Sequence, residues 1–257
     1  MPVLIGTSGW HYRHWRGGFY PASLPARSWL AHYSARFATV ELNNAFYRLP
    51  EATTFADWGR ALPADFVVSV KASRYLTHVR RLREPEEPVH RLMERAGALG
   101  PKLGPVLLQL PPNLRVDAPV LARTLRAFPR GTRVAVELRH ESWFVPAVRE
   151  VLREAGAAAC LTDTAGRPGP LWRTADWGYL RLHGGRGLPP TCYGRTALAT
   201  WARRLADSWP AGADVFVYFN NDAHGCAPRD ARRFAAAAAR VGLPASRVPA
   251  ARETPLT

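Results

Sequence analysis

The sequence has few cysteines and no long apolar run. Its three cysteines, Cys160, Cys192 and Cys226, include no close pair along the 257 residues. This spacing argues against a disulfide framework and against a zinc cluster. No run of about 18 apolar residues occurs, and a membrane-spanning helix needs one. The first ten residues lack the basic and apolar regions of a secretory signal. We therefore expect a protein of the reducing cytoplasm with no membrane segment.

Lysine is also scarce, although the chain is basic. Lys71 and Lys102 are the only lysines among 35 basic side chains, and the formal net charge is +15. The arginine excess can reflect coding bias in a chain rich in Ala, Gly and Pro. Clusters such as 78–84 and 238–252 can be solvated faces. Positive charge nevertheless attracts anionic polymers without further chemistry, so nucleic acid stays open as a partner.

The glycine-rich nucleotide motifs G-x-G-x-x-G and G-x-x-x-x-G-K-[ST] are both absent. The chain instead contains eight short apolar runs, rich in β-branched residues and bounded by Gly, Pro, Asp or Asn. Such runs are typical of strands. They cover residues 3–10, 39–47, 65–73, 104–112, 133–140, 157–163, 178–185 and 214–222.

Most segments between these runs have helical patterns. Capping residues and apolar spacings of three and four predict helices over 28–37, 53–62, 88–100, 117–128, 144–156, 196–209 and 228–242. The sixth connector, 164–177, is rich in Gly and Pro and is predicted to be irregular. Eight alternating units in about 250 residues suit an α/β fold of the TIM-type (β/α)8 barrel class. We predict a single barrel domain over residues 1–257, with an open doubly wound sheet as the rival.

Side chains alternate between two faces along each predicted strand. One face is apolar and should pack against the helices: Val40, Leu42, Val68, Val70, Val106, Leu108, Leu110, Val134, Val136, Leu138, Leu180, Leu182, Val215, Val217 and Phe219. The other face becomes polar toward the carboxyl end of every strand, where barrel enzymes have their active sites. It comprises Ser8, Trp10, Glu41, Asn43, Ser69, Lys71, Gln109, Glu137, Arg139, Asp163, Arg181, His183, Tyr218, Asn220 and Asp222.

Ion pairs that close the barrel offer a purely structural explanation of this polar face. Its charged members include both carboxylates and cations, so internal pairing is feasible. Buried ion pairs, however, add little net stability, because desolvation offsets their attraction. An apolar interior would serve a structural barrel equally well, so we favour a functional site.

Seven motifs, in order along the chain, resemble those of the YecE-like family, also called domain of unknown function 72. They are IGTSGWHYRHWRGGFYP (5–21), TVELNNAFYRLP (39–50), FVVSVKASRYLTH (66–78), KLGPVLLQLPP (102–112), VELRHESW (136–143), YLRLHG (179–184) and VYFNND (217–222). The resemblance implies a TIM-type barrel and no established reaction. Asn44 and Ala45 stand where a Ser-Thr pair is common in the family, which concerns only the local hydrogen bonding.

The polar face supplies the residues of a candidate site. We assign catalytic roles to Glu41, Lys71, Glu137 and His183. We assign substrate contacts to Trp10, Asn43, Gln109, Arg139, Asp163, Arg181, Asn220 and Asp222. Asn220 and Asp222 should orient a ligand or a catalytic partner, whereas Asn221 should close the turn. His78, in the loop after the third strand, ranks low because a lone loop histidine is usually a surface residue.

Lys71 admits two interpretations. It could form a Schiff base if desolvated, but beside Glu41 or Glu137 it would stay protonated and act as an electrostatic clamp, which we prefer. Glu41 and Glu137 form only a weak glycosidase pair, since their strands are well separated. The interior cations also argue against a divalent metal, and we predict no cofactor.

Two loops suggest ligands. The loop 10–20 interleaves aromatic and arginine side chains that could stack on a base or a sugar, or could plug the barrel rim. In the loop 183–195, glycines could bring backbone N–H groups to an anion, aided by Arg186 and Arg195. The sequence therefore favours an enzyme acting on a small anionic or phosphorylated substrate, by hydrolysis, isomerisation or lyase chemistry. The alternative is a nucleic-acid-binding or nucleic-acid-processing protein.

Overall fold

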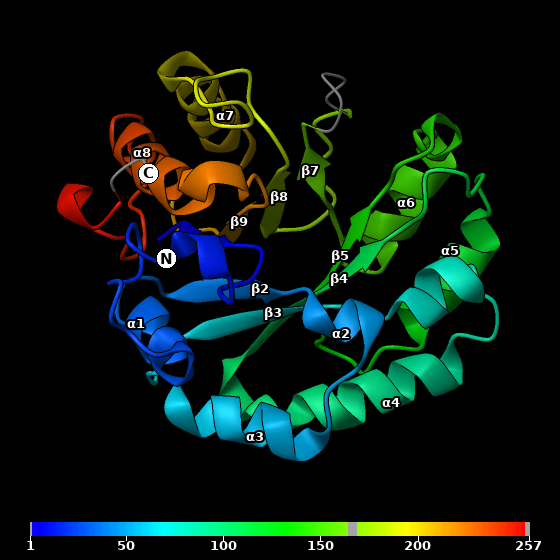
Figure 1. Ribbon diagram of the computed structural model, residues 1–257. Coiled ribbons are helices and arrows are strands. Elements are labelled where there is room, and N and C mark those ends of the chain that lie inside the picture. Colours follow the sequence, from blue (N-terminus) through cyan, green and yellow to red (C-terminus); the bar gives the residue numbers. More distant parts are fainter. Residues whose placement is uncertain (1, 164–168, 255–257) are drawn as a thin grey trace.

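The computed structural model describes residues 2–163 and 169–254, in which strands alternate with helices. The helices lie around the outside of the strands (Figure 1). The strands are β1 (Leu4–Thr7), β2 (Thr39–Leu42), β3 (Val67–Lys71), β4 (Leu103–Gln109), β5 (Val134–Glu137), β6 (Ala158–Ala159), β7 (Leu161–Thr162), β8 (Gly178–Leu182) and β9 (Val215–Phe219). Each lies within one of the predicted apolar runs except β4, which begins one residue earlier.

The strands form two parallel sheets. One has the order β1-β9-β8-β7 and the other β2-β3-β4-β5-β6. The predicted strand 157–163 contributes to both, because β6 pairs with β5 and β7 pairs with β8, with Cys160 between them. At the other side, a parallel bridge joins Ser8, after β1, to Glu41 on β2. The prediction of an α/β fold with parallel strands is confirmed.

All seven predicted helices occur, with shifted ends. They are α1 (Trp29–Ser34), α3 (Ala52–Ala61), α4 (Glu86–Ala96), α5 (Ala118–Arg126), α6 (Pro146–Glu154), α7 (Arg195–Ser208) and α8 (Cys226–Ala239). The extension of the second predicted strand to residue 47 is wrong, because the chain turns into the short helix α2 (Asn44–Tyr47). Of the sixth connector, residues 169–177 contain no helix or strand, and residues 164–168 lie outside the described part. No helix in the two described ranges is long and apolar enough to span a bilayer.

Strand alternation sorts the buried apolar side chains into two cores. All fifteen residues predicted to face the helices belong to the larger core, which also contains apolar side chains from the helices. The smaller core contains opposite-parity residues from both sheets, including Leu107 of β4 and Phe216 of β9. Hydroxyl groups also join the sheets, since Tyr179 bonds Ser69 over 2.8 Å and Tyr218 bonds Thr39 over 2.7 Å. The polar ends of the inner face therefore lie above a packed interior.

The cysteine spacing argued against a disulfide framework, yet the structure contains one disulfide. Cys192 and Cys226, which are 34 residues apart, form a disulfide that ties the loop after β8 to the first residue of α8. Cys160 is a buried free thiol. Spacing along the chain could not show this pair, because the loop must first fold back across the start of α8. Asn221 contributes to that folding through bonds to the Thr191 carbonyl and to Asp230.

Helix α5 begins with a side-chain cap that can be tested directly. The Asp117 carboxylate accepts a hydrogen bond of 3.1 Å from the Val120 amide. Ser28, the matching residue before α1, makes no such bond. Asp117→Ala should therefore lower the free energy of unfolding by about 1 kcal/mol in urea titrations. Ser28→Ala should change it far less, and equal losses in the two variants would contradict the capping assignment.

Candidate active site

The centre of the candidate site is a buried arginine held between two carboxylates. Arg181 on β8 donates from Nε and Nη2 to Glu41 on β2, over 2.9 to 3.2 Å. Its Nη1 donates to Glu137 on β5 over 2.5 Å. Glu41 and Glu137 are fully buried and Arg181 is 1% exposed. Three residues that the sequence predicted to meet at the carboxyl ends of the strands are thus in contact.

The two carboxylates have further partners that occupy their remaining oxygen positions. Glu41 accepts bonds from the Ser8 hydroxyl at 2.8 Å and the Tyr179 hydroxyl at 2.7 Å. Glu137 accepts two bonds of 3.0 Å from the Gln109 amide and one of 2.8 Å from Arg139 Nε. Sequence reasoning did not single out Tyr179, although it has the same strand parity as Arg181.

Both carboxylates are ionised at neutral pH. Burial alone would raise the pKa of Glu41, but the charge of Arg181 and the bonds from Tyr179, Arg181 and Ser8 hold this pKa below its usual value. Burial likewise opposes ionisation of Glu137, but the charge of Arg181, the adjacent His183 ring and the charge of Arg139 lower the pKa of Glu137 well below its usual value. Because their oxygens are already engaged, these carboxylates position the arginines and are poorly placed to accept a substrate proton.

Lys71, at the end of β3, differs from these residues because it has no acceptor. Its Nζ lies 3.9 Å from the centre of the Phe46 ring, and no hydrogen bond or ion pair joins it to any residue of the described ranges. The predicted partners Glu41 and Glu137 bond Arg181 instead. Burial and the nearby Arg181 charge lower the pKa of Lys71 to about 8, although Glu41 and Glu137 partly oppose this shift.

His183 is oriented by its neighbours. Its Nδ1 lies 3.1 Å from the Asn220 amide nitrogen, and its Nε2 lies 3.5 Å from Glu137 Oε1 without a hydrogen bond. An amide nitrogen only donates, so Nδ1 accepts and the neutral ring carries its proton on Nε2. The Asp163 carboxylate accepts from the His183 backbone N–H at 2.9 Å and from the Tyr193 hydroxyl. His183 can therefore donate a hydrogen bond from Nε2, while Asn220 orients its ring and Asp163 holds its backbone.

Two residues that sequence reasoning ranked low or missed also belong to the site. The His78 ring packs edge-on against Phe46 at 5.1 Å, on the same aromatic side chain that Lys71 contacts. Burial, followed by the charges of Lys71, Arg74 and Arg139, lowers the pKa of His78. Phe46 lies on α2, which the sequence pattern read as strand. Lys71 ends β3 and His78 lies in the helical turn that follows it. Their positions in the sequence did not indicate that both would contact Phe46.

Three predicted substrate contacts lie outside the Arg181 cluster. Trp10 is 8% exposed and packs edge-on against Trp58 of α3. Asp222 accepts a bond of 2.7 Å from the Trp15 indole and forms a 3.0 Å ion pair with His14, joining the end of β9 to the loop after β1. Asn43 lines a small cavity of about 70 Å³, and its Oδ1 is buried without a partner.

Several of the groups predicted to contact ligands in the two loops are engaged within the protein. In the first loop, Trp15, Phe19 and Tyr20 are almost fully buried against one another, so they plug the rim and cannot stack on a base. In the second loop, the Gly185 and Gly187 amides donate to the carbonyls of Thr191 and Cys192.

Glycine is required in the second loop for a structural reason. A Cβ atom at Gly185 or Gly187 would lie 2.4 or 2.6 Å from the Cys192 carbonyl oxygen. These glycines therefore close the loop on itself, and their N–H groups are not available to an anion.

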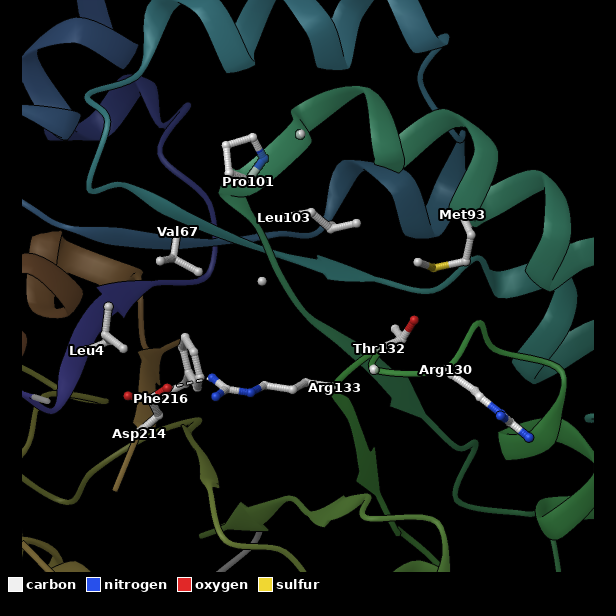
Figure 2. Close-up of a pocket in the computed structure, with 13 residues that line it drawn as sticks. Leu4, Val67, Met93, Pro101, Leu103, Arg130, Thr132, Arg133, Asp214 and Phe216 are labelled. Atoms are coloured by element: carbon white, nitrogen blue, oxygen red, sulfur yellow. Dashed lines mark hydrogen bonds and ion pairs between the residues drawn. The ribbon is translucent and has the colours of Figure 1, made fainter. Parts of the chain in front are cut away.

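Another cavity lies at the opposite end of the strands. It measures about 500 Å³ and is lined by side chains at the amino ends of β1, β3, β4 and β9, including Leu4, Val67, Leu103 and Phe216 (Figure 2). Arg133 reaches across it to Asp214 over 2.6 Å, whereas Arg130 extends away from this pair (Figure 2). The cavity shares no residue with the predicted site.

Metal-ligating residue types stay apart within the described part of the chain. Among residues 2–163 and 169–254, no three His, Cys, Asp or Glu side chains come together in a way that could hold a metal ion. The acidic residues of the site instead accept bonds from arginine, hydroxyl, amide, indole and backbone donors.

Comparison with known proteins identifies the family. Residues 4–253 match the family described as "Protein of unknown function DUF72". The UPF0759 protein YunF of Bacillus subtilis is 25% identical over 87% of this chain and 90% of its own. The UPF0759 protein YecE of Escherichia coli is 28% identical over 58% of this chain and 52% of its own. A crystal structure of a DUF72 family protein from Thermotoga maritima superimposes with a TM-score of 0.78, at 27% identity, covering 91% of this chain and 98% of that one. The predicted resemblance is confirmed, and the chain belongs to the DUF72 family.

Proposed function

We propose that the two sheets form one TIM-type (β/α)8 barrel and that its carboxyl-end mouth is an enzyme active site for a small anionic substrate. The Ser8–Glu41 bridge on one side and the single residue between β6 and β7 on the other support closure. The smaller core, with side chains from both sheets, fits a packed barrel interior. The polar cluster then lies where barrel enzymes have their active sites.

One observation carries the proposal: donors at the mouth outnumber acceptors. The four polar contacts of Arg181 use both central carboxylates, which leaves Lys71 Nζ and His183 Nε2 without acceptors in the described part of the chain. Arg139 donates to Glu137 only through its Nε, and its side chain is 27% exposed. Cationic and N–H donors that lack acceptors in a partly desolvated site favour an anion.

The arrangement also supplies a proton donor. His183 presents Nε2–H beside Glu137, and the Asn220 amide fixes that tautomer. A donor beside an anion clamp can polarise a carbonyl or protonate a leaving group, which serves hydrolysis, isomerisation and lyase chemistry alike. We assign the clamp to Arg139, the donor role to His183, and positioning roles to Glu41, Glu137 and Gln109.

Calorimetric titration with glycolate and inorganic phosphate tests the proposal. Arg139→Gln should weaken binding by about tenfold or more, because it removes a charge-assisted hydrogen bond. The matched control is Arg153→Gln, since Arg153 is an exposed arginine on α6 whose ion pair with Glu150 lies away from the mouth. Equal affinity in wild type, Arg139→Gln and Arg153→Gln would exclude an anion site at the mouth.

A further inference from the structure

We propose that Lys71 captures a carbonyl compound as an imine, so that the substrate class is a small aldehyde or ketone carrying an anionic group. This inference rests on the proposed function for the anionic group, while the imine is a separate statement about Lys71. It is motivated by the contacts of Lys71 Nζ, which differ from those of every other cation at the mouth.

Burial and nearby positive charge make Lys71 easier to deprotonate than an ordinary lysine, although the Phe46 ring alone would favour the cation. Its Nζ lies over the Phe46 ring at 3.9 Å, the residue is 8% exposed, and no carbonyl or carboxylate in the described ranges accepts a bond from it. Loss of a proton therefore costs this amine no hydrogen bond. Arg181 and Arg139 add positive charge nearby, and the resulting pKa of about 8 leaves an appreciable neutral fraction at physiological pH. A desolvated lysine beside other cations is an activated nucleophile.

Lys102 provides the contrast within the same chain. Its ammonium donates to the carbonyls of Gly59 and Leu62, the latter at 2.6 Å, and so joins the loop before β4 to the end of α3. The Lys102 amine is thus engaged by two carbonyl oxygens, whereas Lys71 Nζ has no such partner in the described ranges. Because the sequence contains no third lysine, each side-chain amine can be assigned separately.

The chemical step balances. After Lys71 Nζ has released a proton to solvent, its lone pair attacks the carbonyl carbon, and the π electrons of the C=O bond move to oxygen, which takes up a proton. The attacking nitrogen, now positively charged, loses a proton to solvent, which gives the neutral carbinolamine. The carbinolamine then takes up a second proton on oxygen while the nitrogen lone pair expels water. One ammonium and one carbonyl thus become one iminium and one water. Nitrogen releases two protons and oxygen takes up two, so no oxidant or reductant is required. The iminium keeps its positive charge over the Phe46 ring.

The position of the anionic group follows from the neighbouring cations. Arg139 lies close enough to affect the protonation of both Lys71 and His78, and its exposed side chain has donors left after bonding Glu137. A carboxylate or phosphate next to the carbonyl could bond Arg139 while the carbonyl carbon meets Nζ. Glyoxylate, an aldehyde bearing a carboxylate, is the smallest probe with both groups.

Reductive trapping tests the imine. Full-length protein is incubated at pH 7 with glyoxylate and cyanoborohydride, and the carboxymethylated peptides are quantified by mass spectrometry. We expect Lys71 to be labelled roughly tenfold faster than Lys102, or more, because only the neutral amine reacts. Lys102→Arg should leave labelling of residue 71 unchanged, whereas Lys71→Arg, which keeps the positive charge, should abolish it. Equal labelling of the two lysines, or preferential labelling of Lys102, overturns the proposal.

Two comparisons separate this inference from the proposed function. Glycolate, which has no carbonyl, reports the anion site alone. If glycolate binds in an Arg139-dependent manner but glyoxylate is not trapped on Lys71, the imine is wrong and the anion site stands. If Lys71 is trapped equally fast by glyoxylate and uncharged acetaldehyde, and Arg139→Gln has no effect on either, the imine chemistry stands and the anionic substrate class is wrong.

Discussion

Arg181→Met should lower the free energy of unfolding by about 3–5 kcal/mol, the range observed when one partner of a buried ion pair is removed. Arg181 is the shared partner of Glu41 and Glu137, and all three residues are almost completely buried. Without it, Glu41 retains only neutral hydroxyl donors, and Glu137 retains Gln109, Arg139 and His183. Two carboxylates then remain desolvated with inadequate charge compensation, and urea titration measures the loss.

The pH dependence of this loss has a definite sign. In the wild type the pKa values of Glu41 and Glu137 are lowered, so their stabilising contribution is present above the ordinary value of 4.5 and is lost as pH falls through the folded-state values. In Arg181→Met, burial dominates and should raise both pKa values. The difference in unfolding free energy between variant and wild type should therefore be smaller near pH 4.5 than at pH 7.5.

Two controls distinguish charge from shape. The triple variant Glu41→Gln, Arg181→Met, Glu137→Gln should recover part of the lost stability, because the unpaired charges are then gone. Arg153→Met removes an exposed arginine from its ion pair with Glu150 and should leave the unfolding midpoint nearly unchanged. If the Arg181→Met deficit were the same at both pH values and unrelieved in the triple variant, lost packing rather than uncompensated charge would be its cause.

Strand alternation explains why the members of the site could be predicted from the sequence. Successive side chains of a strand point to opposite faces, so the order of residues within each strand shows that Glu41, Glu137 and Arg181 point inward. Their hydrogen-bond partners depend on the relative register of strands that are far apart in the sequence. For that reason the sequence predicted that Lys71 pairs with Glu41 or Glu137, whereas in the structure Arg181 bonds both carboxylates.

The remaining misses arose where the chain leaves its strands. The apolar residues after Leu42 continue the strand-like pattern of β2, yet they form α2 and place Phe46 under Lys71. The Cys192–Cys226 pair likewise depends on how a loop folds over α8. Aromatic residues in the loop after β1 indicated a stacking surface by composition alone, although burial makes Trp15 part of the core. The composition of a loop shows which side chains it contains, but it does not determine which of them are buried.

Gly6→Ala should cost about 3 kcal/mol of unfolding free energy, at the upper end of the usual penalty for overpacking. Gly6 lies on β1 where this strand approaches β2, and a Cβ atom there would be 2.3 Å from the Thr39 carbonyl oxygen. Thr39 cannot easily move away. Its carbonyl accepts a bond from the Tyr33 hydroxyl, and its own hydroxyl bonds the Val67 carbonyl and Tyr218.

The expected separation of β1 from β2 also reaches the candidate site, because the Ser8 hydroxyl bonds Glu41 two residues beyond Gly6. Gly97 is the matched control, since it lies at the end of α4 with an ordinary backbone conformation and a Cβ atom there would meet nothing within 4 Å. Gly97→Ala should leave stability unchanged or raise it slightly. If both alanine variants unfolded at the wild-type urea concentration, the two sheets would not be held together by a close approach at Gly6. A selective loss in Gly6→Ala would instead identify this contact as a requirement for joining the sheets and for holding Ser8 against Glu41.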